Sequence, residues 1–210
     1  MFGIIQKGGP LMYLIILCSV IALAVVIERL WHLYRAGINT QDFLGELGRF
    51  IKRNKIVEAI DICDRTPGPI AYTLKAGILR HDRSKEEIKE AVENAALDEV
   101  PRLEKNLGVL ATIAHISPLL GLLGTVAGMI KCFQVIQVKA SAFNPINPGD
   151  LAEGIWVALI TTAAGLTVAI PSLVAHNYLV SRVNNFVLDM ERAATNLIDI
   201  LSKRSQSYEV

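Results

Sequence analysis

The chain has 210 residues, of which 52% are hydrophobic, and its mean hydropathy of +0.41 is too high for an ordinary soluble domain. Its 21 basic and 20 acidic residues nearly cancel but are unevenly spread, because charged side chains are absent from residues 8–27, 106–130 and 154–181. Each block can cross a hydrocarbon core of about 30 Å. The sequence therefore predicts an all-α membrane protein with three transmembrane helices, and we expect no nucleic-acid partner.

Residues 1–10 are predicted to form a short segment on the outer face, and residues 11–34 the first span. Ala22-Leu23-Ala24 imitates a signal-peptide cleavage site, but the apolar run continues to Glu28-Arg29, which is longer than a typical signal core. Trp31 and Tyr34 follow, as is typical of a membrane boundary. We therefore expect this segment to be retained as a membrane anchor.

Residues 35–106 carry basic and acidic residues in equal numbers and predict a helical cytoplasmic insert. Apolar residues at helical spacing indicate a first helical stretch: Leu44, Leu47, Phe50, Ile51, Val57 and Ile60. This stretch ends at Thr66-Pro67-Gly68-Pro69. A short helix from Ile70 to Leu79 follows, and Ser84 with Glu87 predicts the capped start of a third helix. We expect that third helix to bend at Pro101 and to run unbroken into the second span, residues 107–133.

The second span carries small residues on one face. Gly121, Thr125 and Gly128 share a helical face, with Gly124 in the same series, so another helix can approach closely and Thr125 is expected at the contact. The third span, residues 153–180, repeats this pattern. Its expected packing stripe, with Thr161 beside it, consists of Ala158, Thr162, Gly165, Ala169 and Ser172.

Residues 134–152 form a connector rich in asparagine and proline, after which Asp150 is the expected N-cap of the third span and Glu153 its capping-box partner. Residues 181–210 predict a helical tail. Its apolar seam consists of Val183, Val187, Met190, Ala194, Leu197 and Leu201. Basic residues near the span ends favour a cytoplasmic insert and tail, with the N-terminus and the connector, including Lys7 and Lys139, on the outer side.

Thr125 and Thr162 are predicted to lie level in the membrane, each roughly 7.5 Å to the outer side of the midpoint. Their hydroxyls can hold water or a polar group of another chain, or they can bond carbonyls of their own helices. A hydroxyl does not titrate near neutral pH, and no Asp, Glu or Lys occurs at mid-membrane depth. If protons or ions cross, the carboxylate must therefore come from a partner chain.

Three further polar residues lie toward the cytoplasmic ends of the spans. His115 and His176 are candidates for a proton relay or for capping the helix bundle, and Glu28 either marks the boundary or attracts cations. The three cysteines, Cys18, Cys63 and Cys132, have no spacing typical of a disulfide framework or a zinc site. No nucleophile-base set or paired carboxylates appear, so we expect neither an enzyme nor a cofactor.

The stretches Pro118–Met129 and Ala158–Pro171 closely resemble the two signature helices of the MotA/TolQ/ExbB proton-channel family, nearest to its ExbB branch, with the TolQ branch next. The likeness extends to Gly8-Gly9-Pro10, Glu28-Arg29, the helical insert and the helical tail. It implies a subunit of the bacterial inner membrane that forms a homopentamer around an ExbD-like single-span partner bearing an aspartate. Proton flow past that aspartate would then drive a TonB-like or TolA-like protein, with Thr125 and Thr162 lining the pathway and Thr161 beside them.

One position departs from the family pattern. Many relatives carry a glutamate five residues before the second threonine, where this chain has Val157. The resemblance therefore leaves a TolQ-like or gliding-type motor, or the use of another ion, as alternatives to an ExbB-like duty. A non-conducting membrane scaffold is the alternative from a different functional class.

Overall fold

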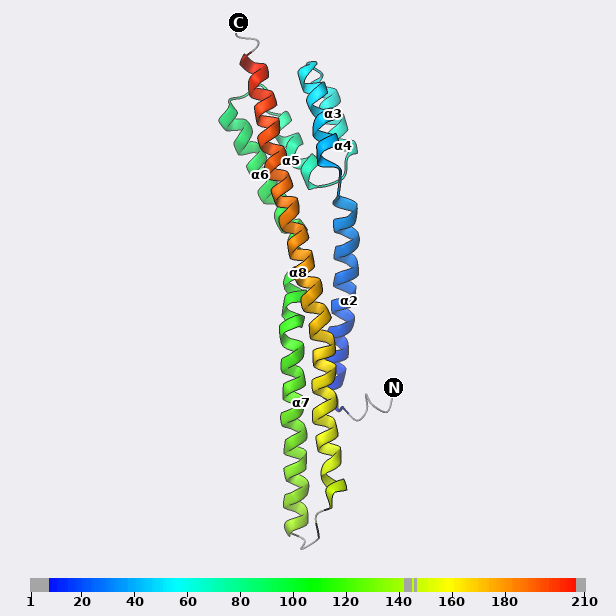
Figure 1. Cartoon of the computed structure of the whole chain (residues 1–210). Coiled ribbons are helices and arrows are strands. Elements are labelled where there is room, and N and C mark those ends of the chain that lie inside the picture. Colours follow the sequence, from blue (N-terminus) through cyan, green and yellow to red (C-terminus); the bar gives the residue numbers. More distant parts are fainter. Residues whose placement is uncertain (1–7, 142–144, 146, 207–210) are drawn as a thin grey trace. The chain divides into compact units, whose positions relative to one another are not determined.

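The computed structural model describes residues 8–141, 145 and 147–206, without the side chains of 203–206. Its elements are all helices: α2 (Pro10–Ala36), α3 (Thr40–Lys52), α4 (Ile56–Arg65), α5 (Pro69–Ile78), α6 (Lys85–Glu104), α7 (Leu107–Ser141) and α8 (Pro148–Gln206) (Figure 1). Lys7, most of the expected outer N-terminal segment, and residues 142–144 and 146 of the connector lie outside the described residues.

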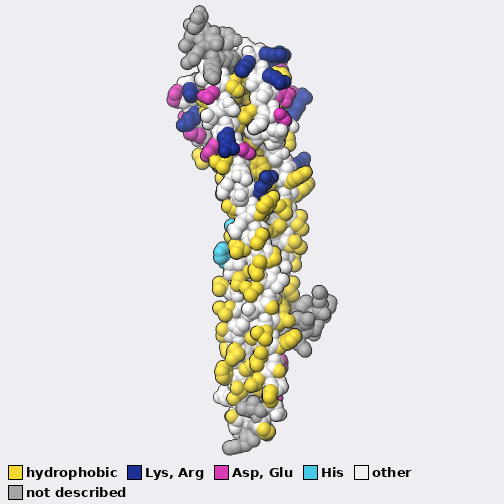
Figure 2. Space-filling model, viewed as in Figure 1, with side chains coloured by type: hydrophobic (Ala, Val, Ile, Leu, Met, Phe, Trp, Pro, Cys, Tyr) yellow, Lys and Arg dark blue, Asp and Glu magenta, His cyan; other side chains and the backbone are white. Residues whose placement is uncertain are grey.

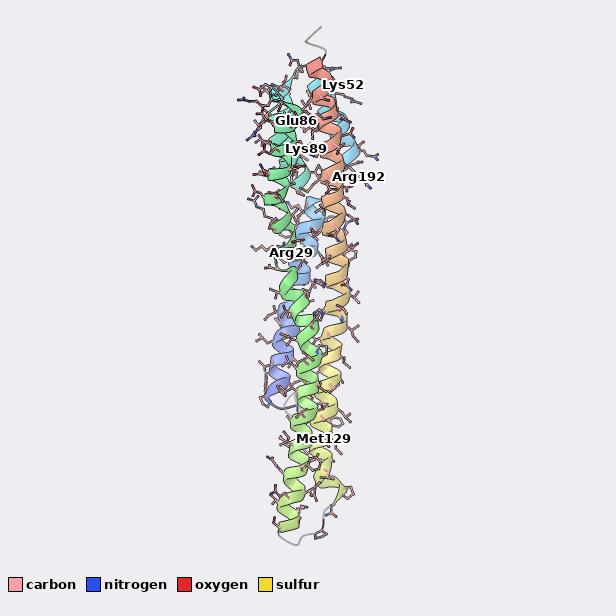
Figure 3. The ribbon with its side chains drawn as sticks, turned by 90° about the vertical axis from the view of Figure 1, so that its left-hand side faces the viewer. Arg29, Lys52, Glu86, Lys89, Met129 and Arg192 are labelled. Carbon is pink, nitrogen blue, oxygen red and sulfur yellow. The ribbon has the colours of Figure 1, made fainter. Side chains whose placement is uncertain are left out.

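The chain divides into two compact units. We name the described parts of 1–28 and 106–178 the span unit, and those of 29–105 and 179–210 the charged unit. Figure 2 shows hydrophobic side chains covering the span unit, while Lys, Arg, Asp and Glu gather on the charged unit. Among the labelled side chains of Figure 3, Met129 lies on α7, whereas Lys52, Glu86, Lys89 and Arg192 lie on the charged unit.

The span unit contains the apolar part of α2, all of α7 and the first half of α8. Each carries a stretch long and apolar enough to cross a membrane. Their large side chains are mostly exposed, and a continuous apolar surface of this kind is not stable in water. The chain is therefore an all-α membrane protein with three spans, as the sequence predicts.

The charged unit has a conventional hydrophobic core. The fully buried large side chains in this unit are Leu47, Ile51, Ile70, Leu74, Ile78, Leu103, Leu179, Val183, Met190 and Leu197. A methyl group at Gly77 of α5 would lie 2.6 Å from Val92 Cγ2 of α6 and 3.1 Å from Leu197 Cδ2 of α8. Gly77 thus lets α5 pack directly between these two helices, and the predicted seam of α8 supplies much of the core.

The first part of the insert is two helices, where the sequence indicated one stretch. After α3, Asn54 adopts a left-handed φ of 59°, and the N–H groups of Asn54 and Lys55 donate to the carbonyls of Ile51 and Phe50 at 3.1 and 3.0 Å. This hydrogen-bond pattern is the Schellman motif that ends helices. The chain therefore turns before α4, and Val57, one of the residues that indicated a single helical stretch, is 78% exposed.

The helix predicted to run unbroken into the second span is interrupted. Ser84 caps α6 as predicted, its Oγ accepting from Glu87 N–H at 3.2 Å, and the helix continues through Pro101. It then ends at Glu104, because Asn106 has a left-handed φ of 62°, and α7 starts at Leu107. The interruption is thus caused by Asn106 and not by Pro101.

Helix α8 begins two residues before the predicted N-cap. Asp150 lies in its first turn, and the carboxylate accepts from Asn147 N–H at 2.9 Å, so Asn147 occupies the cap position. Glu153 lies a further turn inside α8, where it is exposed. The prediction of Asp150 and Glu153 as a capping pair is therefore wrong.

Candidate functional site

The α7 and α8 helices meet through residues without bulky side chains. On α7 the buried positions are Ser117, Gly121, Gly124, Gly128 and Cys132, at the spacing of one helical face. A methyl group at Gly121 would lie 3.0 Å from Thr161 O and from Thr162 Cα, and one at Gly165 would lie 2.5 Å from Ser117 O. The backbones are therefore in close approach, which in lipid provides the packing that holds helices together.

All seven predicted packing residues lie in buried positions: Gly121, Gly124, Gly128, Ala158, Gly165, Ala169 and Ser172. Sequence reasoning missed Ser117, Cys132 and Gly154, which extend the same face toward both ends. A methyl group at Gly154 would lie 2.5 Å from Cys132 Sγ and 2.6 Å from Gly128 O. The signal was available, since each of the three lies four residues from a predicted packing residue.

The threonine at the centre of this contact is Thr161. Its side chain is fully buried against Gly124, where even a methyl group would overlap it, and its Oγ1 donates to Val157 O at 2.8 Å. Thr162, expected in the packing stripe, is half-buried beside it. Thr162 Oγ1 donates both to Ala158 O at 3.1 Å and across the interface to Gly121 O at 3.2 Å.

Thr125 lies beside the α7 packing face and not within it. It is half-buried, and its Oγ1 donates to Leu122 O of its own helix at 2.6 Å. Because its neighbour Gly124 contacts Thr161, Thr125 lies at about the level of Thr161 and within about one helical turn of Thr162. The three hydroxyls therefore form a band at one depth, and Thr125 and Thr162 keep part of their surface open.

The remaining polar candidates lie apart from this band. His115 is exposed and its Nδ1 lies 2.7 Å from Ala111 O, while half-buried His176 has Nδ1 at 3.4 Å from Asn177 Oδ1. The Glu28 carboxylate accepts from Asn106 Nδ2 at 2.8 Å, where α2 passes the start of α7. The structure therefore does not join these three residues to the threonines.

Acidic and basic groups gather instead where α7 ends and α8 begins. Lys139 pairs with Asp150, and that hydrogen bond, with the one from Asn147 N–H, holds the pKa of Asp150 below its ordinary value. A cavity of about 400 Å³ next to them is also lined by Lys131 and Glu153. Val157 lies one turn after Glu153 on α8 and is buried, and it carries no carboxylate. The carboxylate nearest to the threonines on this helix is therefore that of Glu153, which is exposed.

Among the described residues, no three His, Cys, Asp or Glu side chains come together as a metal site would require. Ser117 Oγ is buried and, within the same part of the chain, makes no hydrogen bond. The site is thus a band of hydroxyls on closely packed helices, and hydroxyl groups do not titrate near neutral pH.

Several known proteins are similar in sequence to this chain. Residues 65–192 match the MotA/TolQ/ExbB proton channel family. A putative biopolymer transport protein ExbB homolog of Methanothermobacter thermautotrophicus is 28% identical over 89% of this chain and 65% of its own length. A putative ExbB-like protein 1 of Synechocystis is 34% identical, over 83% of this chain and 68% of its own. The Tol-Pal system protein TolQ of Haemophilus influenzae is 37% identical over 51% of this chain and 45% of its own length. The chain thus spans about two thirds, or less, of these relatives.

Proposed function

Because the chain belongs to the MotA/TolQ/ExbB proton channel family, we propose that it is an ExbB-like channel subunit of an inner-membrane machine that turns a proton gradient into mechanical work. The observation that carries the proposal is the band of Thr125, Thr161 and Thr162 where α7 and α8 approach through glycines. The resemblance read from Pro118–Met129 and Ala158–Pro171 is confirmed at the level of the family.

In this proposal the open hydroxyls of Thr125 and Thr162 line the proton pathway. Each can rotate from its present carbonyl acceptor to bond water or a carboxyl group. Thr161 is buried against Gly124, so its role is to set the distance between the helices. His115, His176 and Glu28 lie outside the band and are proposed as polar residues toward the cytoplasmic ends of the spans.

A partner supplies the proton-carrying group. The described spans hold no carboxylate near the threonine band, so we assign that role to an aspartate on an ExbD-like single-span protein surrounded by several copies of this chain, most simply five. The complex would act on a TonB-like protein to drive transport through the outer membrane. The insert and tail would be cytoplasmic and the N-terminus periplasmic.

Two alternatives have observations of their own. A TolQ-like duty, acting on a TolA-like protein, is favoured by the relative named TolQ. A non-conducting scaffold is favoured by the hydrogen bonds of the three threonines, all of which end on helix carbonyls, as they would if the hydroxyls served only the helices.

Threonine-to-valine variants in the full complex separate conduction from scaffolding, because valine keeps the shape and removes the hydroxyl. We expect Thr125→Val and Thr162→Val to reduce proton-driven uptake by at least tenfold, as is typical for a lost catalytic hydrogen bond. Thr167→Val is the matched control, since Thr167 is exposed on α8, the helix of Thr162, and its Oγ1 donates to Ala163 O at 2.8 Å. The variants must still co-purify with the single-span partner.

The outcomes distinguish the hypotheses. Undiminished uptake in both Thr125→Val and Thr162→Val, in complexes that assemble normally, would establish the scaffold and rule out these hydroxyls as the pathway. A partner that links to TolA-like instead of TonB-like proteins would assign the chain to the TolQ-like duty. Replacing the proton gradient by a sodium gradient would identify the ion.

A further inference from the structure

A second cavity, of about 690 Å³, lies within the charged unit, next to the end of α2. Its lining comes from the last turns of α2, the loop between α4 and α5, and one face of α5 and α6. The loop lies close to the end of α2, since a methyl group at Gly68 would lie 2.7 Å from Ala36 O, and Gly68 has a left-handed φ of 122°. The Pro67-Gly68-Pro69 turn therefore forms one wall of the cavity.

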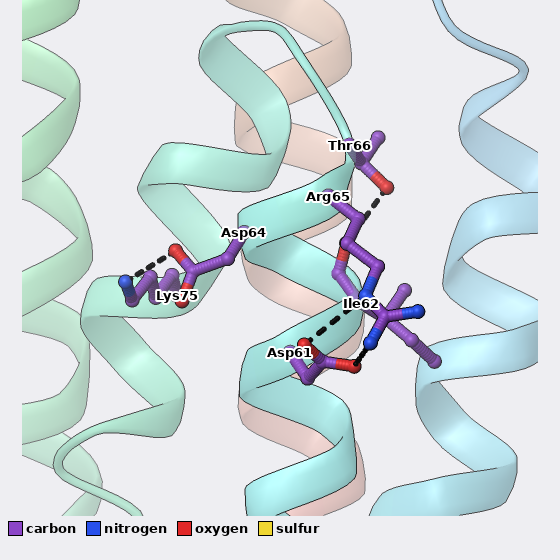
Figure 4. A network of polar contacts seen from close by, with 6 residues as sticks. All are labelled: Asp61, Ile62, Asp64, Arg65, Thr66 and Lys75. Carbon is purple, nitrogen blue, oxygen red and sulfur yellow. Dashed lines mark hydrogen bonds and ion pairs between the residues drawn. The ribbon is translucent and has the colours of Figure 1, made fainter.

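The cavity has an excess of positive charge that concentrates at Arg35. Its lining includes three cations and two carboxylates, Arg35, Lys75, Arg102, Asp64 and Glu99. Lys75 pairs with Asp64 at 2.5 Å (Figure 4), and Arg102 pairs with Glu99 at 2.5 Å. Arg35 is exposed and forms no ion pair with any side chain that the structure describes. Its guanidinium is therefore available for an anion.

Two aromatic side chains, of the kind found at membrane boundaries, line the same cavity. Trp31 lines it and is 69% exposed, and the Tyr72 ring lies 5.9 Å from the guanidinium carbon of Arg102. Tyr34, on the next turn of α2, is exposed to solvent by 84%. Trp and Tyr at the end of a span lie at the level of lipid headgroups, where an arginine meets phosphate.

We propose that this cavity binds the headgroup of an anionic phospholipid. Arg35 donates to the phosphate, since a guanidinium matches phosphate oxygens in a bidentate geometry, and Arg102 beside the Tyr72 ring lines the same cavity. Trp31 contacts the upper part of the acyl chains. A soluble anion needs no such aromatic boundary, which is why the lipid is the occupant we choose.

The chain contains two tryptophans, Trp31 and Trp156, and this permits a site-specific test. The full chain with Trp156→Phe, reconstituted in phosphatidylcholine vesicles, keeps Trp31 as its only indole. Brominated phosphatidylglycerol and brominated phosphatidylcholine, at equal low mole fraction, are then compared as quenchers. We expect the anionic lipid to quench Trp31 several-fold more strongly, and Arg35→Gln to reduce that preference about fivefold, the effect of one basic residue at a membrane surface.

Two controls isolate the cavity from general attraction to the membrane. Arg80→Gln removes an exposed arginine of the same unit that does not line the cavity, and it should leave the preference unchanged. Trp31→Phe keeps only Trp156, in another unit of the chain, and should show equal quenching by both lipids. Equal quenching of Trp31 by the two lipids, or equal losses in Arg35→Gln and Arg80→Gln, would overturn the proposal.

Inorganic phosphate distinguishes the source of the anion. If added phosphate abolishes the preference for brominated phosphatidylglycerol at constant ionic strength, the cavity selects soluble phosphate and the lipid assignment is wrong. If Trp156→Phe does not insert, native mass spectrometry of the unaltered chain and of Arg35→Gln replaces the fluorescence. Retention of phosphatidylglycerol over phosphatidylcholine by the unaltered chain alone supports the proposal, and equal retention contradicts it.

Discussion

At the scale of single residues, the contact between Gly124 and Thr161 sets how closely α7 and α8 approach. Thr161 is fully buried, and its Oγ1, Cβ and Cγ2 all occupy the space that a side chain at position 124 would need. Packing of this kind has little room to relax, because these three Thr161 atoms lie within two bonds of its backbone. The geometry of the threonine band therefore depends on glycine at position 124, because any larger side chain would overlap Thr161.

We expect Gly124→Ala to destabilise the α7–α8 pair by about 1–3 kcal/mol, the usual cost of overpacking. Gly108→Ala is the matched control on the same helix, since no atom lies within 4 Å of a methyl group there, and it should be neutral or stabilising. Thermal denaturation of the purified assemblies measures both. Thr161→Gly in the Gly124→Ala background should restore part of the loss, and an unchanged transition in Gly124→Ala would contradict the contact.

Cys63 gives a prediction on pH. Burial, with a contribution from the Asp64 carboxylate and opposition from Lys75, raises the pKa of the Cys63 thiol from 9.0 to about 11. The folded protein therefore holds this proton more tightly than the unfolded chain does. The resulting stabilisation is complete below pH 9 and is lost as the pH rises from 9 to 11.

Alkylation of Cys63 measures this shift, with Cys18→Ser and Cys132→Ser leaving one thiol. At pH 8 the reaction should be about 100-fold slower than in the unfolded chain, because the thiolate fraction falls tenfold per pKa unit. The rate should still climb above pH 9, and Asp64→Asn should move the profile to lower pH. A rate that levels off near pH 9 would show that the pKa is not raised.

At the scale of elements, the left-handed asparagines Asn54 and Asn106 decide where helices end. Each follows an α-helix by two residues, the position that favours glycine or asparagine. Asn106 also donates to Glu28, and Arg29 Nη1 donates to Arg102 O at 3.2 Å, so adjacent residues of α2 contact both sides of the interruption. The break between α6 and α7 is therefore a built feature of the fold.

Substitutions at Asn106 test that conclusion. Asn106→Gly keeps the left-handed φ, whereas Asn106→Ala does not, so the alanine variant should be less stable than the glycine variant by about 1–2 kcal/mol. Asn94, exposed within α6, is the control, because in a helix interior alanine should be the more stable by about 1 kcal/mol. Thermal unfolding gives both differences. If the alanine variant were more stable than the glycine variant at both positions, Asn106 would not be what ends the helix.

The spans and their packing faces were predictable from sequence, but which threonine lies in the contact was not. Charge-free blocks indicate α2, α7 and α8, and small residues at helical spacing indicate the interface. The spacings Gly121-Gly124-Gly128 and Gly121-Thr125-Gly128 fit one face equally well, and only the buried Thr161 side chain selects Gly124. Adjacent Thr161 and Thr162 differ by about 100° on the helix, less than periodicity resolves across a broad stripe.

The helix ends were harder to predict because each depends on a single hydrogen-bond choice. Asp150 and Asn147 are both good capping residues, and the structure uses the backbone N–H of Asn147 with the carboxylate of Asp150. Similarly, proline is a stronger helix breaker than asparagine, yet the helix passes through Pro101 and ends at Glu104, two residues before the left-handed Asn106. Long-range contacts such as that of Asn106 with Glu28 decide between such options, and local sequence does not contain them.

At the scale of the whole molecule, the proposed activity requires a titratable group beside the threonine band. Within the described spans, the threonine band has no carboxylate or lysine beside it, and the nearest acid on α8, Glu153, is exposed toward the α7–α8 turn. At the position where the family resemblance leads one to expect an acid, this chain has Val157, whose side chain is apolar and buried. In the proposed function, proton transfer is therefore assigned to a complex of this chain with a partner.

Vesicles containing a pH-sensitive dye measure this requirement directly. The chain alone should pass protons no faster than empty vesicles, since hydroxyl groups bonded to carbonyls neither bind nor release protons near neutral pH. Addition of the single-span partner should start the flux, and an Asp→Asn change in that partner should stop it while the complex still co-purifies. A flux through the chain alone that equals the flux of the complex would place the proton carrier within this chain, and Glu153→Gln would then be the first variant to examine.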